Sequence, residues 1–204
     1  MTTEAVGSAE VDGRTARRDR NRDAVLDAVL ELFSEDCLAP AAQDVAARSG
    51  VSLRSVYRYY EDMDELVRQA IARNVERAEP LFEVPGPDDG VLTERIDAFV
   101  TARLALYEAM GPTMRAALLR SRSSELVRQQ IAAARRRLLD QVRHTFRPEL
   151  AGMSAGARRE VAAAIDVLLE FESAEHLRRH RGLSGPETRR TLERAVAALL
   201  AAER

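Results

Sequence analysis

Side chains able to bind phosphate and the edges of nucleotide bases are concentrated between residues 52 and 60. Two arginines lie in this segment, and a guanidinium can donate two parallel hydrogen bonds to phosphate or to guanine. Serine and tyrosine hydroxyls accompany them, and a phenol combines an apolar ring with a polar tip. No acidic residue interrupts the segment, so positive charge is concentrated locally. The candidate contact residues are Ser52, Leu53, Arg54, Ser55, Tyr57, Arg58 and Tyr59.

Residues that could support catalysis or bind a metal are poorly grouped. No Ser/His/Asp set, carboxylate pair or glycine-rich phosphate loop has a catalytic spacing, so we expect no enzyme and no catalytic residues. His176 and His180 have the i, i+4 spacing of a metal site, with Glu172 nearby, but arginines crowd the same turn, which favours a solvated helix end. We therefore expect no cofactor and no metal. The single Cys37 is more typical of a small packed residue than of a redox sensor.

Two short helices and a turn are expected to position the 52–60 segment. A helical pattern begins near Ala41 and stops at Gly50, which can adopt the positive φ of a tight turn. Ser52 can cap the second helix. Val56 and Tyr60 share a face of that helix and can pack back on the first one. This spacing is that of a helix-turn-helix.

Helical periodicity extends over most of the remaining chain. Aromatic residues make up 4% of the sequence, Trp is absent, and no long stretch alternates polar and apolar residues, which predicts an all-α fold of about nine helices. We expect a disordered tail over 1–14, a three-helix DNA-binding domain of the helix-turn-helix type over 15–62, and a larger helical domain over 63–204. A connector helix near 63–79 begins the larger domain. The other helices are predicted near 91–110, 114–121, 124–146, 155–181 and 186–203.

The charge of the whole chain gives no drive toward nucleic acid. The net charge is −2, and all 31 basic residues are arginine, so a binding surface must come from local charge segregation. A second basic segment precedes the helix-turn-helix, where Arg14, Arg17 and Arg18 could contact phosphate or the minor groove. No apolar run could span a bilayer, and the first residues lack the apolar stretch of a signal peptide. We therefore expect a soluble, cytoplasmic protein with no membrane partner.

The combined spacing resembles the N-terminal DNA-binding domain of the TetR (tetracycline-repressor-like) family of bacterial transcription regulators. The resemblance rests on residues 44–46, 50–52, 56–60 and 64–66, within about 18–68. It implies a homodimeric transcription regulator, with repression as the expected activity. The resemblance further implies that the dimer binds a palindromic operator in double-stranded DNA and that a small-molecule effector releases it.

The same resemblance assigns roles to individual residues. It maps the recognition helix to residues 52–60, so the side chains named for that segment would contact DNA, together with Gln43 on the preceding helix. The family usually has Gly where this chain has Asp36, Thr where it has Ala41, and Lys where it has Met63. The Thr and Lys are typical phosphate contacts, so their loss weakens sequence-independent affinity, whereas Asp36 can still adopt the turn conformation.

The resemblance says little about the C-terminal domain. Its last two apolar helices need a partner surface, which either the rest of the domain or a second subunit supplies. We expect a second subunit to supply it through Val161, Ile165, Leu168, Leu192, Val196 and Leu199. An apolar effector pocket could be lined by Phe99, Leu104, Tyr107, Met110, Met114 and Leu118, although core packing fits these residues equally well. One alternative function stays open: a helical interaction protein that keeps the helix-turn-helix fold without binding an operator.

Overall fold

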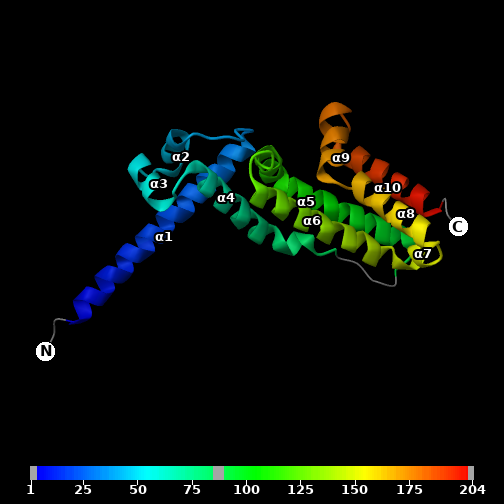
Figure 1. The fold of residues 1–204 in the computed structure, drawn as a ribbon, viewed down its shortest axis with the longest axis horizontal. Coiled ribbons are helices and arrows are strands. Elements are labelled where there is room, and N and C mark those ends of the chain that lie inside the picture. Colours follow the sequence, from blue (N-terminus) through cyan, green and yellow to red (C-terminus); the bar gives the residue numbers. More distant parts are fainter. Residues whose placement is uncertain (1–3, 85–89, 202–204) are drawn as a thin grey trace. The chain divides into compact units, whose positions relative to one another are not determined.

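The structure is a computed structural model that describes the backbone of residues 4–84 and 90–201, and the side chains from Thr15 onward in those ranges. The described residues form ten α-helices and no strand, which confirms the all-α prediction (Figure 1). A short 3₁₀ helix at Glu79–Phe82 and a π-helical turn at His176–His180 complete the elements. None of the described helices is long and apolar enough to cross a membrane.

The chain divides into two compact units. Unit 1 comprises Met1–Arg77 and Pro112–Arg120, and unit 2 comprises Ala78–Gly111 and Ser121–Arg204. The N-terminal unit extends to Arg77, which is beyond residue 62, the predicted end of the DNA-binding domain. The reason is that the first part of the expected connector helix buries Leu66, Val67 and Ala70 completely.

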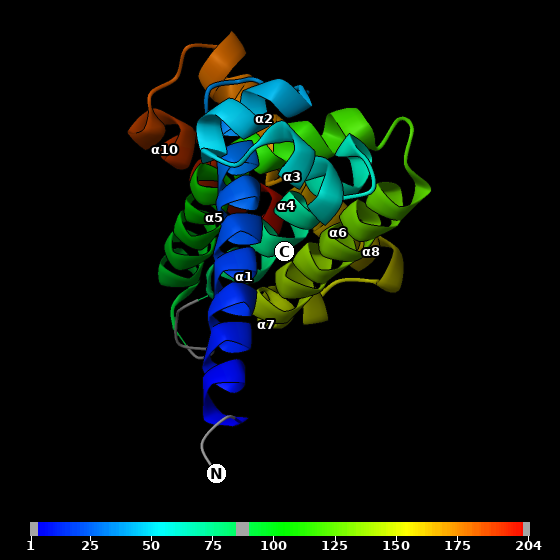
Figure 2. The ribbon, with the colours of Figure 1, turned by 90° about the vertical axis from the view of Figure 1, so that its left-hand side faces the viewer.

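Unit 1 is built on its first helix. It contains α1 (Glu4–Ser34), α2 (Ala42–Ser49), α3 (Leu53–Tyr59) and most of α4 (Met63–Ala78). Helix α1 presents Val25, Val29 and Phe33 on one face, and all three are fully buried. Helices α2 and α3 pack against this helix and against each other (Figure 2).

Helix α1 is longer than the sequence analysis predicted. It begins at Glu4, whereas a tail over residues 1–14 and a helix from about Thr15 were expected. Alanine, glutamate and valine dominate residues 4–6 and 9–11, so little in their helix propensity opposes continuation of the helix along its axis. The side chains before Thr15 lie outside the described residues.

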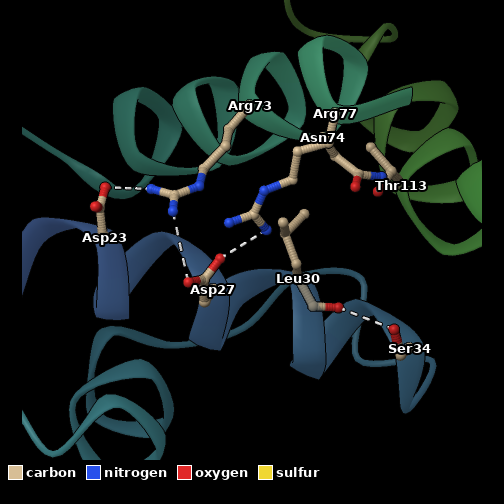
Figure 3. A network of polar contacts seen from close by, with 8 residues as sticks. All are labelled: Asp23, Asp27, Leu30, Ser34, Arg73, Asn74, Arg77 and Thr113. Carbon is tan, nitrogen blue, oxygen red and sulfur yellow. Dashed lines mark hydrogen bonds and ion pairs between the residues drawn. The ribbon is translucent and has the colours of Figure 1, made fainter. Parts of the chain in front are cut away.

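A polar network joins α1 to α4 (Figure 3). Arg73 pairs with Asp23 and also lies 3.6 Å from Asp27. Arg77 pairs with the same Asp27 at 2.8 Å. Two aspartates one helical turn apart thus face two arginines one turn apart, which fixes the register of α4 along α1. Because the side chains are partly solvent-exposed, each pair contributes well under about 1 kcal/mol.

The end of α5 (Leu92–Arg120) belongs to unit 1, although its first part belongs to unit 2. Asn74 of α4 donates a 2.7 Å hydrogen bond to Thr113 (Figure 3). Arg115 pairs with Asp36 at 3.0 Å, and Arg120 pairs with Asp64. Three contacts therefore attach this segment to the loop after α1 and to both ends of α4.

The prediction of separate helices at 91–110 and 114–121 was wrong. Pro112 lies inside α5 without ending it. A proline removes one backbone hydrogen bond and strains the preceding turn, at a cost of about 3 kcal/mol. Burial offsets that cost here, since Thr113, Ala116 and Ala117 are all buried beyond the proline. The boundary between the two units coincides with Pro112.

Unit 2 contains the first part of α5, followed by α6 (Glu125–Thr145), α7 (Arg147–Ala151), α8 (Ala155–Leu168), α9 (Phe171–Glu175) and α10 (Gly185–Ala201). Its core is a continuous apolar cluster from α5, α6, α8 and α10. Phe99 and Phe146 meet edge to face in this cluster, with ring centroids 5.3 Å apart. Unit 2 thus covers its own apolar surfaces largely from within.

The predicted single helix over 155–181 was also wrong. Helix α8 stops at Leu168, and Glu170 is extended with ψ 157° before α9 begins. Tyr107 of α5 donates a 2.6 Å hydrogen bond to the Leu169 carbonyl, and Ser173 donates one of 2.6 Å to the Val167 carbonyl. Side chains thus satisfy carbonyls that the interrupted helix leaves without backbone partners.

The Asp36 turn gives a stability prediction. Asp36 is the one non-glycine residue with positive φ (60°) in the described chain. We expect Asp36→Ala to be less stable than Asp36→Gly by about 1–2 kcal/mol, because both variants lose the ion pair with Arg115 but only alanine is strained at left-handed φ. Asp36→Asn should stay within about 0.5 kcal/mol of the native protein, since the Asp36 side chain is mostly exposed. Urea unfolding measures these differences, and equal stability of the Ala and Gly variants would contradict a backbone effect.

Candidate functional site

The turn between α2 and α3 has the predicted geometry. Gly50 ends α2 with φ 68°, in the left-handed region. Ser52 caps α3, since its hydroxyl accepts a 3.3 Å hydrogen bond from the Ser55 amide. Val56 and Tyr60 are each 2% exposed, which confirms that both are core residues. The buried face of α3 is therefore fixed, and the opposite face is turned to solvent.

The exposed face of α3 carries the arginines and one of the tyrosines. Arg54 and Arg58 are exposed, and Tyr57 is 56% exposed, which is unusual for so large an apolar ring. Ser52 is exposed at the start of the helix, while Leu53 and Ser55 are half-buried. Gln43 is exposed on α2. This surface offers guanidinium, phenol, hydroxyl and amide groups without a carboxylate on α3.

Tyr59, which was predicted to contact DNA, has a mostly buried side chain. It is 9% exposed, so its ring belongs to the core of unit 1. Its hydroxyl nevertheless accepts hydrogen bonds from Asn21 at 3.4 Å and from Arg58 at 3.2 Å. These hydrogen bonds, Asn21's first, lower the pKa of Tyr59, and the charges of Arg58 and Arg18 add to the effect. Tyr59 therefore holds the polar side chains of Asn21 and Arg58 in place, while its own ring stays buried.

Asn21 is a residue of this surface that the sequence analysis missed. It lies on the same helix as the exposed Arg17 and Arg18, within hydrogen-bonding reach of the α3 tyrosine. Its signal in the sequence is weak, because an asparagine among arginines on a helix is ordinary surface composition. Arg14, which was predicted with Arg17 and Arg18 as a DNA contact, lies outside the residues whose side chains are described.

Arg48 is occupied elsewhere. This residue of α2 pairs with Glu35 at 2.8 Å and lies 3.5 Å from Glu31 of α1. The hydrogen bond from Arg48 lowers the pKa of the Glu35 carboxyl. The guanidinium is therefore held against α1, and the basic surface of the helix-turn-helix comes from α3 and α1.

Ala41 and Met63 occupy structural positions at helix starts. Ala41 is the N-cap of α2, and its amide donates a 3.1 Å hydrogen bond to Asp44. Alanine has no side-chain acceptor, so the reciprocal half of the capping box is missing. Met63 is the first residue of α4, whose start is capped by a 2.7 Å hydrogen bond from the Glu65 amide to Asp62. Neither Ala41 nor Met63 can donate a hydrogen bond from its side chain.

The residues predicted for the dimer interface lie mainly inside unit 2. Val161, Ile165, Leu192 and Val196 are at most 7% exposed in a single chain and belong to its own core cluster. Their assignment to a subunit interface needs correction, because a side chain already buried within the protomer has little surface left for a partner. Leu168 and Leu199 are half-buried.

The residues predicted for an effector pocket are also mostly committed to packing. Phe99, Tyr107 and Met110 are buried, and the Tyr107 ring meets Phe171 edge to face at 5.7 Å. Leu104 is half-buried against the unit 2 core. Met114 and Leu118 belong to the part of α5 in unit 1, so the predicted set is divided between the two units. Core packing, which the sequence left as an equal alternative, describes Phe99 and Tyr107 better.

Two buried arginines on α5 were also missed. Arg95 is 7% exposed and pairs with the equally buried Glu149, while its Nη1 donates a 3.1 Å hydrogen bond to the Thr145 carbonyl. Arg103 is 3% exposed. With Phe99 and Tyr107 they follow an i, i+4 spacing along one face, and this spacing is a signal that the sequence analysis could have used.

His176 and His180 lie in the π-helical turn after α9, with ring centroids 5.3 Å apart. Across the part of the chain that the structure describes, no group of three His, Cys, Asp or Glu side chains is arranged to hold a metal ion.

Comparison with known proteins agrees with the geometry of unit 1. The family model described as bacterial regulatory proteins, tetR family, matches residues 25–70. This segment is therefore similar to bacterial regulatory proteins of the tetR family. The matched segment contains the turn at Gly50, the whole of α3 and the start of α4.

A curated relative and solved structures extend the comparison to more of the chain. The HTH-type transcriptional repressor LfrR of Mycolicibacterium smegmatis is 36% identical over 89 residues, which cover 40% of this chain and 44% of LfrR. The alignment therefore spans less than half the length of that curated relative. A transcriptional regulator from Rhodococcus sp. Rha1 has a TM-score of 0.66 at 16% identity, with 91% of this chain and 96% of that chain covered. SmeT, in a complex with triclosan, has a TM-score of 0.57 at 20% identity, with 89% and 90% covered.

The incomplete cap of α2 gives a prediction for the helix-turn-helix. Ala41→Thr adds a side-chain acceptor for the Asp44 amide, which donates to the Ala41 carbonyl at 3.0 Å in the native protein, so it should raise the free energy of unfolding by about 1 kcal/mol. Ala47→Thr, at an exposed position in the middle of α2, is the matched control and should give no gain. Chemical denaturation of the three proteins measures the difference, and equal stability of Ala41→Thr and the native protein would show that the N-cap is not limiting.

Proposed function

We propose that this protein is a ligand-responsive transcription regulator that represses its target by binding a palindromic operator as a homodimer. The observation that carries the proposal is the solvent-exposed face of α3, where Arg54, Tyr57 and Arg58 follow directly on the Gly50 turn. The match of residues 25–70 to the tetR-family model and the repressor activity stated in the name of LfrR support it. A regulator of bacterial DNA acts in the cytoplasm, which agrees with the expected localisation.

Different exposed side chains of unit 1 would contact the DNA bases and the DNA phosphates. An α-helix fits the major groove, and residues at its N-terminal end reach the base edges. Arg54 lies there and can donate two hydrogen bonds to guanine. Tyr57 and Gln43 would contact phosphate, and such contacts set register without sequence preference. Arg17 and Arg18 on α1 add cationic groups beside Tyr59, in place of the phosphate contacts that Ala41 and Met63 cannot make.

The surface for a second subunit is the outward face of α8 and α10. Val167 of α8 is 59% exposed, and Ala163 of α8, with Ala197 and Ala198 of α10, is exposed as well. Small side chains let helices approach closely, and the half-buried Leu168 and Leu199 can complete the contact. Pairing through this face would form a four-helix bundle. A two-fold dimer binds half-sites about 34–36 Å apart, one turn of DNA.

Helix α5 is the element through which an effector would act on DNA binding. Its first part carries Phe99, Arg103 and Tyr107 in the core of unit 2. Its last part, beyond Pro112, is attached to unit 1 through Arg115 and Arg120. A ligand that binds one arrangement of α5 more tightly than another shifts the population of DNA-binding conformations by that difference in affinity. The complex of SmeT with triclosan supports a small organic effector.

The losses at Ala41 and Met63 favour one other function, an interaction protein that keeps the fold without reading an operator. Binding to the DNA that flanks the gene separates the two. Repression requires a sequence-selective complex whose affinity falls with salt as phosphate contacts are replaced by counterions. An interaction protein would give no selective complex at low salt.

Arg54→Ala should weaken operator binding by about 1–3 kcal/mol and relax specificity at one base pair in each half-site. Tyr57→Phe removes a hydroxyl that contacts phosphate, so it should weaken binding to all sequences alike. Fluorescence anisotropy against an operator and single-base variants distinguishes the two patterns. Unchanged operator affinity for Arg54→Ala would show that the recognition surface has been misplaced.

Val167→Asp should convert the dimer to a monomer, because it buries an unpaired carboxylate in the proposed interface. Val91→Asp is the matched control, since Val91 is also an exposed valine of unit 2 (62%) but lies at the start of α5. Analytical ultracentrifugation measures the dissociation constant of each protein. A Val167→Asp protein that dimerises as tightly as the control would place the interface elsewhere.

A further inference from the structure

Arg103 is a buried cation with unused hydrogen-bonding capacity. Its Nη2 donates to the Leu138 carbonyl at 3.1 Å and to Gln141 at 3.3 Å, both on α6. The guanidinium lies 4.9 Å from the centre of the Phe99 ring. Its Nη1 is buried and has no hydrogen-bond partner among the described residues. A guanidinium so deep in an apolar core normally has its donors satisfied.

Asp166 of α8 is the complementary group. Its Oδ1 is also buried without a hydrogen-bond partner among the described residues. Burial raises the pKa of the Asp166 carboxyl, and the charge of Arg103 is the largest effect opposing that rise. The charge of Arg103 therefore acts on the Asp166 carboxyl, but no ion pair or hydrogen bond among the described residues joins the two side chains. Arg103 thus offers a cationic donor and Asp166 an anionic acceptor that no hydrogen bond of the described residues uses.

The neighbouring charged side chains are paired with other groups and do not supply the missing hydrogen bonds. Arg135 lies 3.3 Å from Glu170 and also pairs with Glu172. Arg143, whose charge also reaches Asp166, pairs with Asp140 at 3.1 Å. The Tyr107 hydroxyl donates to the Leu169 carbonyl, and a hydrogen bond from the Arg103 guanidinium opposes the burial that raises the pKa of Tyr107. Arg103 Nη1 and Asp166 Oδ1 thus remain as one positive and one negative group without partners.

The charge balance decides which ligand fits. An anionic ligand drawn to Arg103 would meet the repulsion of Asp166 and Glu170, and a cationic ligand drawn to Asp166 would meet that of Arg103. A neutral molecule that offers an acceptor and a donor satisfies both groups without adding charge. Its apolar part would suit the surroundings, since Arg103 is in contact with the Phe99 ring and the apolar core of unit 2.

We propose that Arg103 and Asp166 form the polar end of the effector site, and that the effector is a neutral molecule, such as a carboxamide with an apolar body. Its oxygen accepts a hydrogen bond from Arg103 Nη1, and its N–H or O–H donates one to Asp166 Oδ1. This inference rests on the proposed function, because it identifies the chemistry of the molecule that would relieve repression. The site lies on the same helix as the contacts between α5 and the DNA-binding unit.

Three probes that share a phenyl ring test the charge preference on the full-length protein without DNA. Benzamide is neutral with an acceptor and a donor, benzoate is an anion, and benzylamine is a cation. Isothermal titration calorimetry should show saturable binding of benzamide and at least about tenfold weaker binding of the other two, because each of those meets one uncompensated like charge. Equal binding of all three probes, or binding of none, would overturn the proposal. Binding of none is expected if a water molecule bridges Arg103 and Asp166.

Two variants and a control assign the preference to these residues. Arg103→Met should abolish benzamide binding, whereas Arg136→Met, at an exposed arginine of α6, should leave it unchanged. Asp166→Asn should shift the ratio of benzoate to benzamide affinity by about tenfold toward benzoate, since it removes the negative charge. A structural role alone would not invert a charge preference. An unchanged ratio in Asp166→Asn overturns the assignment even if Arg103→Met fails to fold.

The operator assay keeps the two proposals separate. If the native protein binds its operator selectively but no probe, the effector site is wrong and the proposed function stands. If benzamide binds as expected but no selective operator complex forms, the proposed function fails. Where both hold, benzamide should weaken the operator complex of the native protein and of Arg136→Met, and an effect of equal size on Arg103→Met would refute the link.

Discussion

The presentation of the proposed DNA-binding surface depends on burial of one face of α1. Val25, Val29 and Phe33 on this face are fully buried, and α2 and α3 pack against the helix. Once Val56 and Tyr60 are committed to the core, helical geometry leaves Arg54 and Arg58 on the solvent side. The exposed chemistry of α3 is therefore a consequence of the packing beneath it. Loss of that packing would misplace every contact residue together.

Tyr59 shows how core and surface are joined at this site. Its ring fills space within unit 1, while its hydroxyl holds Asn21 of α1 and Arg58 of α3 by hydrogen bonds. A cationic side chain fixed in this way loses less conformational entropy on binding phosphate than a free one does. In the proposed DNA complex, ordering of Arg58 would offset part of the phosphate affinity that a Thr at position 41 would supply.

The helix-turn-helix was predictable because its determinants are local. Gly50, Ser52, Val56 and Tyr60 specify a turn, a cap and a buried face within eleven residues (50–60). The interface residues were not predictable in the same way. An apolar stripe such as that of α8 has the same periodicity whether its partner is its own chain or a second one, and tertiary packing alone decides that Ile165 is internal. The continuation of α5 through Pro112 likewise depends on burial farther along the helix.

Helix α5 combines polar groups with opposite demands. Arg95 and Arg103 occupy the same buried face, one helical repeat of two turns apart, but Arg95 has a carboxylate partner in Glu149 and Arg103 has none at Nη1. The Arg95–Glu149 ion pair stabilises one packing of α5. The unpaired Nη1 of Arg103 makes the stability of that packing depend on whether a ligand or water supplies an acceptor. Because the same helix continues past Pro112 to the ion pairs of Arg115 and Arg120, satisfaction of Arg103 changes the energy of an element that unit 1 also holds. Coupling between effector binding and DNA binding would then need no chain of intermediate residues, because one helix, α5, takes part in both.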